Sequence, residues 1–82
     1  MLVKDKVMKI MIEHLKLNPD KINPEARFLQ DLGISSMTLW EMLMVMEDEF
    51  NIEVPEEDVR KIRTIRSAIE YIEARVGTET KG

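Results

Sequence analysis

Apolar residues recur at the spacing of an α-helix over about residues 2–16 and again over residues 36–50. The first stretch ends before Asn18-Pro19, because the residue that precedes a proline is pushed out of helical geometry. The second stretch contains neither glycine nor proline, so it is the stronger of the two helix predictions. Between them, residues 19–35 hold two prolines, and this stretch is expected to form a long loop.

Two further helices are predicted in the second half of the chain. Pro55 is followed by three acidic residues, a pattern typical of a helix start, and this short helix is expected to end at about Lys61. Thr64 is placed to cap a last helix over about residues 65–75, which Gly77 stops. No stretch shows the alternation of a strand. The predicted fold class is therefore all-α, a four-helix bundle with three longer helices, one short third helix and a long first loop. That loop carries apolar residues able to attach it to the core: Ile22, Ala26, Phe28, Leu29 and Leu32.

The length and composition predict one small soluble domain. The chain has 82 residues, of which 44% are hydrophobic and 34% charged, and neither half alone would bury a stable core. We expect residues 1–77 to form this domain and residues 78–82 to form a disordered tail. The chain has no cysteine and one histidine, His14, so no metal site or catalytic triad is expected. We also expect no membrane span, because no apolar run approaches about 20 residues, and a cytoplasmic protein is the default.

Charge is unevenly distributed along the chain. The net charge is −4, yet the interval from Phe28 to Val59 contains nine acidic residues and no lysine or arginine. Four cationic residues follow this interval, namely Arg60, Lys61, Arg63 and Arg66. The acidic interval would repel the phosphates of nucleic acid, whereas it favours partner proteins with basic surfaces.

The predicted helix over residues 36–50 has two apolar faces. One face forms the expected core stripe, made of Leu39, Met42, Leu43, Met46 and Phe50. Nearly opposite lie Met37, Trp40 and Met44, beside the acidic residues Glu41, Glu47 and Asp48. Three other helices would hardly cover both faces, so an exposed strip that docks to an apolar, basic patch on another protein is the favoured interpretation. The alternative is that the loop over residues 18–35 folds across this strip.

A serine pair begins the same predicted helix. Ser36 at a helix start would ordinarily be an N-cap, but Ser35 or Thr38 could serve as the cap instead. His14 belongs to a different predicted helix, so no nearby base is expected to activate a serine as a nucleophile.

The stretch Asp31-Leu32-Gly33-Ile34-Ser35-Ser36-Met37 resembles the acyl carrier protein family, whose pattern is Asp-Leu-Gly-x-Asp-Ser-Leu. The resemblance spans about residues 7–72 without a gap, and the combination of its motifs is specific. Further matches are Val7, Ile10, Leu15, Phe28, Glu41, Glu47-Asp48-Glu49-Phe50, Glu53-Val54-Pro55, Ile62, Thr64 and Ala68-Ile69-Glu70-Tyr71-Ile72.

The resemblance implies a carrier and not an enzyme, and a monomer is expected. By resemblance, a separate phosphopantetheinyl synthase attaches 4'-phosphopantetheine from coenzyme A to Ser36, and acyl groups are then held as thioesters. The implied acyl-chain pocket consists of Leu39, Met42, Leu43, Met46, Val59, Ile62 and Ile69. Acyl-transferring or acyl-activating enzymes with basic docking patches are expected to bind Met37, Trp40, Glu41, Met44, Glu47 and Asp48.

The sequence departs from the family pattern at three positions near the serine, one of which is Met37 in place of the commoner leucine. Ser35 stands where the family usually has aspartate, and Trp40 is unusually large for its position, which suggests a narrowed choice of partners. With the basic cluster from Arg60 to Arg66, these departures favour a specialised carrier outside the main fatty-acid cycle. An aminoacyl or peptidyl carrier remains an alternative. So does an unmodified helical interaction module of the same fold.

Overall fold

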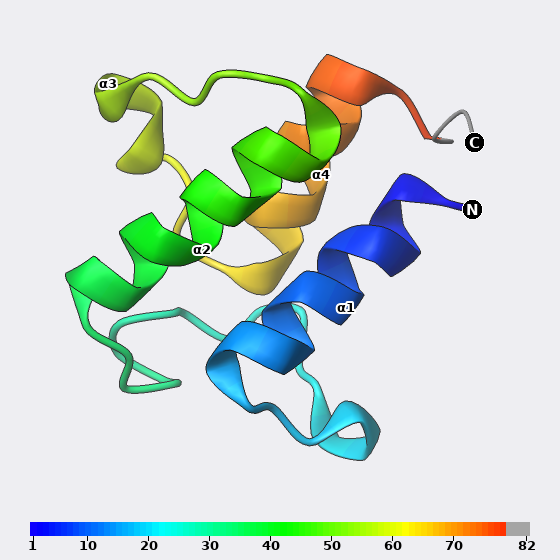
Figure 1. Ribbon diagram of the computed structural model, residues 1–82. Coiled ribbons are helices and arrows are strands. Elements are labelled where there is room, and N and C mark those ends of the chain that lie inside the picture. The colour runs from blue at the N-terminus through cyan, green and yellow to red at the C-terminus, as the bar shows by residue number, and fades with distance from the viewer. Residues whose placement is uncertain (79–82) are drawn as a thin grey trace.

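The computed structural model describes residues 1–78 and contains four α-helices within that range, which confirms the predicted all-α class (Figure 1). The expected tail at residues 78–82 lies outside the described residues except for Thr78. The third helix is shorter than predicted, because the chain turns at Arg60 and Lys61 instead of continuing the helix. The helices are α1 (Val3–Leu15), α2 (Ser36–Phe50), α3 (Glu56–Val59) and α4 (Ile65–Val76).

Left-handed residues end the first two helices. Lys16 follows α1 with φ 54° and donates its backbone N–H to the carbonyl of Ile12. Asn51 follows α2 with the same φ of 54° and donates to the carbonyl of Glu47. Such residues satisfy helix carbonyls that would otherwise lack donors. The first helix therefore ends before the proline, and Pro19 instead begins a short 3₁₀ turn, Pro19–Lys21.

The core lies between α1, α2 and α4, with α1 packed against both of the others (Figure 1). The largest fully buried side chains come from these helices, from the long loop and from the segment before α4: Phe28, Met11, Met42, Leu43, Met46, Ile62, Ile65, Ile72, Val3 and Val7. The long loop is attached to this core as predicted by Ala26 and Phe28, which are buried, whereas Leu29 is exposed. Burial of these side chains stabilises the loop as well as the helices.

Backbone hydrogen bonds join the long loop to the start of α4. The N–H of Phe28 donates to the carbonyl of Arg63 at 2.9 Å, and the N–H of Ile65 donates to the carbonyl of Ala26 at 3.3 Å. A third bond runs from the N–H of Arg66 to the carbonyl of Pro24 at 2.8 Å. The loop that precedes α2 and the segment that connects α3 to α4 are thus fixed against each other.

One carboxylate attaches α3 to α4. Asp58 accepts hydrogen bonds from the Tyr71 hydroxyl at 2.6 Å and from Nη2 of Arg75 at 2.8 Å. The Tyr71 bond and the charges of Lys61 and Arg75 lower the pKa of Asp58. Burial and the hydrogen bond to Asp58 raise the pKa of Tyr71 to about 12. Because α3 is only four residues long, this contact is a principal tether of the helix.

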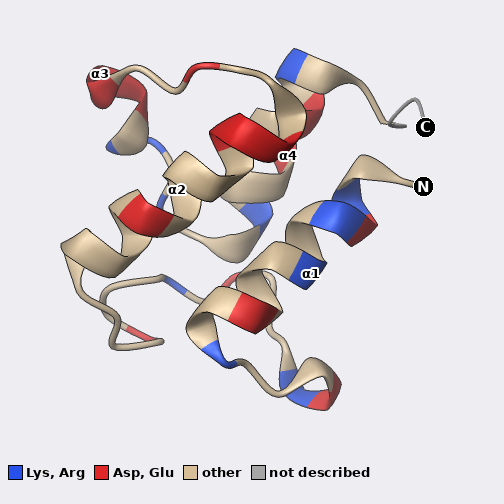
Figure 2. Cartoon of the chain, in the orientation of Figure 1, with Lys and Arg blue, Asp and Glu red and all other residues tan. Residues whose placement is uncertain are grey.

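Figure 2 shows that α2 and α3 carry acidic residues, and α2 contains no lysine or arginine. Among residues 1–78, no helix is both long enough and apolar enough to cross a membrane.

The tether of α3 predicts an abnormal tyrosine titration. The chain has one tyrosine, so phenolate absorbance reports Tyr71 alone. We expect half-ionisation near pH 12 in the folded protein, since the Tyr71 pKa is about 12, and near pH ~10 in the unfolded chain. Because the folded state holds this proton more tightly, the stabilising contribution is complete below pH ~10 and is lost as the pH rises through the folded pKa.

The Asp58→Asn variant is the control for this titration, because it removes the carboxylate that raises the Tyr71 pKa. Its native-state midpoint should be lower than that of the unmodified chain. If Tyr71 in the folded protein with Asp58 intact were half-ionised near pH ~10, α3 would not be tethered through this contact.

Candidate functional site

The two serines at the start of α2 have different roles. Ser35 is the N-cap, and its Oγ accepts a hydrogen bond from the backbone N–H of Thr38 at 3.1 Å. Ser36 is the first residue of the helix and is exposed. Its hydroxyl makes no hydrogen bond to any other residue in the described part of the chain. Since Ser35 already caps the helix, the Ser36 hydroxyl is left available to solvent.

The turn before α2 positions this serine pair. Asp31 accepts hydrogen bonds from the Arg27 side chain at 3.0 and 3.1 Å and from the Arg27 backbone N–H at 2.8 Å. The side-chain hydrogen bond from Arg27 is the main reason that the pKa of Asp31 is lowered. Gly33 follows with φ 67°, a left-handed conformation that strains other residues. The Asp-Leu-Gly stretch therefore closes the loop and turns the chain into the helix.

The N-terminus of α2 offers a favourable environment for an anion beside Ser36. The backbone N–H groups of Ser36 and Met37 have no acceptor within residues 1–78. Free amides of this kind and the helix dipole stabilise a negative charge, such as a phosphate ester on the serine oxygen. The exposed hydroxyl and these amides fit a phosphopantetheine group, which joins its protein through a phosphate.

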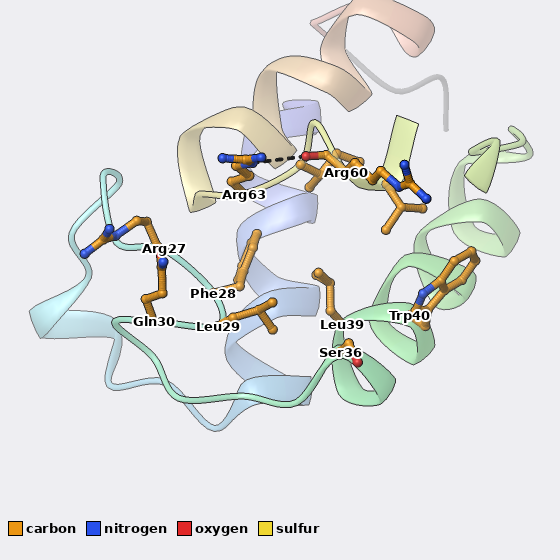
Figure 3. Close-up of a pocket in the computed structure, with 11 residues that line it drawn as sticks. Arg27, Phe28, Leu29, Gln30, Ser36, Leu39, Trp40, Arg60 and Arg63 are labelled. Carbon is orange, nitrogen blue, oxygen red and sulfur yellow. Dashed lines mark hydrogen bonds between the residues drawn. The ribbon is translucent and has the colours of Figure 1, made fainter. Parts of the chain in front are cut away.

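A cavity of about 480 Å³ begins at Ser36 and extends between α2 and the α3–α4 connection (Figure 3). Three residues of the predicted acyl-chain pocket line it, namely Leu39, Val59 and Ile62. The remaining lining residues are Arg27, Phe28, Leu29, Gln30, Trp40, Arg60 and Arg63. The cavity lining thus combines apolar side chains with three arginine residues.

The other four predicted pocket residues lie elsewhere. Met42, Leu43 and Met46 are packed in the core, where they are at most 1% exposed. Ile69 lines a different cavity of about 430 Å³, between α1, the long loop and α4, together with Met8 and Ile22. The structure therefore brings only part of the predicted set together beside the serine.

Sequence reasoning missed several walls of the cavity beside Ser36. Phe28 and Leu29 come from the loop, and Trp40 was predicted only as part of a docking surface. One signal was present in the sequence, because Leu39 and Trp40 follow Ser36 at intervals of three and four residues. Residues at these intervals lie on the same side of a helix.

The second apolar face of α2 is exposed, and the long loop does not fold across it. Met37 is 67% exposed, Trp40 38% and Met44 57%. Glu41 and Asp48 are also exposed and have no ionic or hydrogen-bonding partner in the described range. Glu47 differs, because its Oε2 accepts a hydrogen bond from the backbone N–H of Val54 at 2.9 Å. This bond fixes the connection between α2 and α3, so Glu47 has a structural contact that the other predicted docking residues lack.

The residues best suited to acid–base and metal chemistry do not gather at a common site in residues 1–78. His14 is exposed on α1. In the part of the chain that the structure describes, no group of three or more histidine, aspartate or glutamate side chains could hold a metal ion.

The separate roles of the two serines predict different effects on stability. Ser35→Ala removes the cap and should lower the free energy of unfolding by about 1 kcal/mol. Ser36→Ala removes an exposed hydroxyl without a partner and should change it by less than about 0.5 kcal/mol. Urea unfolding of the two variants measures both values. Equal losses would show that the two hydroxyls share the capping role.

Comparison with known families agrees with this geometry. The family model described as the phosphopantetheine attachment site matches residues 5–72 of the chain. The matched range includes the Asp-Leu-Gly turn, the serine pair and all four helices except the ends of α1 and α4. The domain is therefore a site of covalent 4'-phosphopantetheine attachment, and the chain belongs to the phosphopantetheine-binding family of acyl-carrier-type domains.

Proposed function

We propose that this chain is an acyl carrier protein in fatty-acid or specialised lipid or polyketide-type synthesis, with Ser36 as the attachment residue. One observation carries the assignment to Ser36: its hydroxyl is exposed and without a partner, whereas the Ser35 hydroxyl is engaged in capping α2. The serine at the loop–helix junction is accessible to an external enzyme. The carrier itself supplies no catalytic group in this proposal.

The attachment requires a separate phosphopantetheinyl synthase. Oγ of Ser36 forms a bond to the phosphorus of coenzyme A that bears the pantetheine, and the bond from this phosphorus to the oxygen of 3',5'-ADP breaks. The hydroxyl proton passes to a base of the synthase or to water. Once attached, the group supplies a thiol that holds the cargo as a thioester. The N–H groups of Ser36 and Met37, which have no acceptor within residues 1–78, would stabilise the negative charge of a phosphodiester on this oxygen.

The exposed strip on α2 is proposed as the docking surface for partner enzymes. Met37, Trp40 and Met44 offer apolar contact, and methionine side chains adapt to several partner shapes. Glu41 and Asp48 add negative charge that attracts basic patches. Glu47 contributes charge while it holds the connection to α3.

The size of this strip favours brief contacts over a permanent complex. Only three large apolar side chains are exposed along the second face of α2, which is far less than an obligate dimer interface requires. A carrier must leave each partner after delivery, and electrostatic attraction speeds association more than it prolongs residence. A monomer that acts in the cytoplasm is part of this proposal.

Intact-mass analysis tests the attachment residue. After incubation with coenzyme A and a broad-specificity phosphopantetheinyl synthase, we expect the unmodified chain to gain one phosphopantetheine group. Ser36→Ala should gain none, because it lacks the oxygen that forms the bond. Ser35→Ala is the matched control and should still be modified.

The outcomes separate the competing functions. An unchanged mass with several synthases would favour an unmodified interaction module. If the protein is modified, an attempt to load it with fatty-acyl and aminoacyl adenylating enzymes would distinguish an acyl carrier from an aminoacyl carrier.

Charge reversal tests the docking surface. The double variant Glu41→Lys/Asp48→Lys should lower the second-order rate of modification by a synthase with a basic docking patch by at least about threefold at low salt. The loss should shrink as salt increases, because salt screens exposed charges. The rate of modification is measured by quenching the reaction at several times and determining the modified fraction by mass spectrometry.

The double variant Asp5→Lys/Glu13→Lys provides the control, because it changes the net charge by the same amount and both carboxylates are exposed on α1 without an ionic partner among residues 1–78. An equal loss of rate in this variant would mean that the total charge matters and that α2 is not the docking surface.

A further inference from the structure

The cavity beside Ser36 contains one guanidinium group that the fold does not use. Arg27 is paired with Asp31 through two side-chain hydrogen bonds. Arg63 donates its Nε to the backbone carbonyl of Arg60 at 3.2 Å. The Arg60 side chain lines the cavity but has no acceptor within the described residues. A cation at the edge of an apolar cavity is therefore available to a ligand.

Figure 3 shows how Arg60 lies relative to Ser36. Ser36 is at the start of α2, at one end of the cavity, whereas Arg60 follows α3 and lies at the other end. Leu39 and Trp40 lie between them in this view. A group tethered to Ser36 that enters the cavity would therefore pass apolar walls before it reaches the guanidinium.

The phosphate of the tether does not require Arg60. A phosphodiester on Ser36 lies directly at the N-terminus of α2, where two backbone N–H groups lack other acceptors. Arg60 lines the cavity on the side away from Ser36. It is thus placed for an anion that the far end of the tethered group delivers.

We propose that the cavity accepts an acyl cargo with a short apolar body and a terminal carboxylate, which Arg60 binds. This inference rests on the proposed function, because it requires cargo tethered to Ser36. Leu39, Val59 and Ile62 would contact the methylene groups of such a cargo. The planar guanidinium of Arg60 matches a carboxylate through two parallel hydrogen bonds, which a neutral chain cannot form.

The distribution of charge on the surface favours binding of the cargo carboxylate inside the cavity over binding on the docking strip. Glu41 and Asp48 are exposed on α2 and would repel an anion there. Within the cavity lining, the described residues include three arginines and no aspartate or glutamate. Because Arg60 is exposed, its preference for the carboxylate should be moderate, about three- to tenfold in the ratio of docked to undocked cargo.

A matched pair of cargoes tests this preference. The synthase loads the chain from adipoyl-coenzyme A or from hexanoyl-coenzyme A, which have the same number of acyl carbons and differ in the terminal carboxylate. NMR then follows the Arg60 Nε–H signal and the methyl signals of Leu39, Val59 and Ile62. We expect the adipoyl form to shift the Arg60 signal and the methyl signals, and the hexanoyl form to leave the Arg60 signal unchanged.

Two variants refine the test. Arg60→Gln should reduce the docked fraction of the adipoyl form by about three- to tenfold and leave the hexanoyl form unchanged. Lys61→Gln is the control, because it removes the same charge from the next residue, whose side chain is 75% exposed and lies outside the cavity lining. It should retain the adipoyl-specific shifts.

Three outcomes would overturn the proposal. Equal shifts with adipoyl and hexanoyl cargo would show that the carboxylate is not recognised. Equal effects of Arg60→Gln and Lys61→Gln would show that only net charge matters. An Arg60 shift already present with phosphopantetheine alone would assign the guanidinium to the phosphodiester. Intact mass is measured first, so a chain that is never modified refutes the proposed function separately.

Discussion

The hydrogen bond from the Thr38 N–H to Ser35 Oγ is the contact on which the rest of the site depends. A helix start needs acceptors for its first amides, and one of two adjacent serines supplies such an acceptor. The second serine, Ser36, is therefore not needed to cap the helix. Its hydroxyl and the neighbouring amides of Ser36 and Met37 stay open to a ligand. The cap thus stabilises α2 and at the same time leaves an exposed hydroxyl without a partner at the first residue of the helix.

The capping role of Ser35 explains how serine can replace the aspartate of the family pattern at this position. The family usually has aspartate before the modified serine, and both aspartate and serine are good N-cap residues. The replacement therefore keeps the cap and removes one negative charge from the residue next to Ser36. The cavity itself carries arginine side chains. Both features make this region less negative than the exposed face of α2.

The cavity exists because segments distant in the sequence are fixed against one another. Backbone bonds hold the loop around Phe28 to the segment before α4. The contacts of Asp58 with Tyr71 and Arg75 hold α3 in place, and Glu47 fixes the connection that leads to it. These are polar contacts at the edge of a small core, where few apolar residues remain to define the position of a four-residue helix. Glu47 and Asp58 thus stabilise the fold through these contacts. Glu41 and Asp48 make no such contact and remain exposed.

The sequence by itself determined the helices, the core stripe of α2 and the serine pair, because these features follow from local periodicity and capping chemistry. It also indicated the exposed strip at Met37, Trp40 and Met44, since a helix with two apolar faces exceeds what a small bundle can cover. Only the tertiary structure decided which serine caps, that Met42, Leu43 and Met46 fill the core, and that Arg60 lies across the cavity from Ser36. These outcomes depend on how the loop and α3 pack against α2 and α4, and such long-range contacts leave no periodic trace in the sequence.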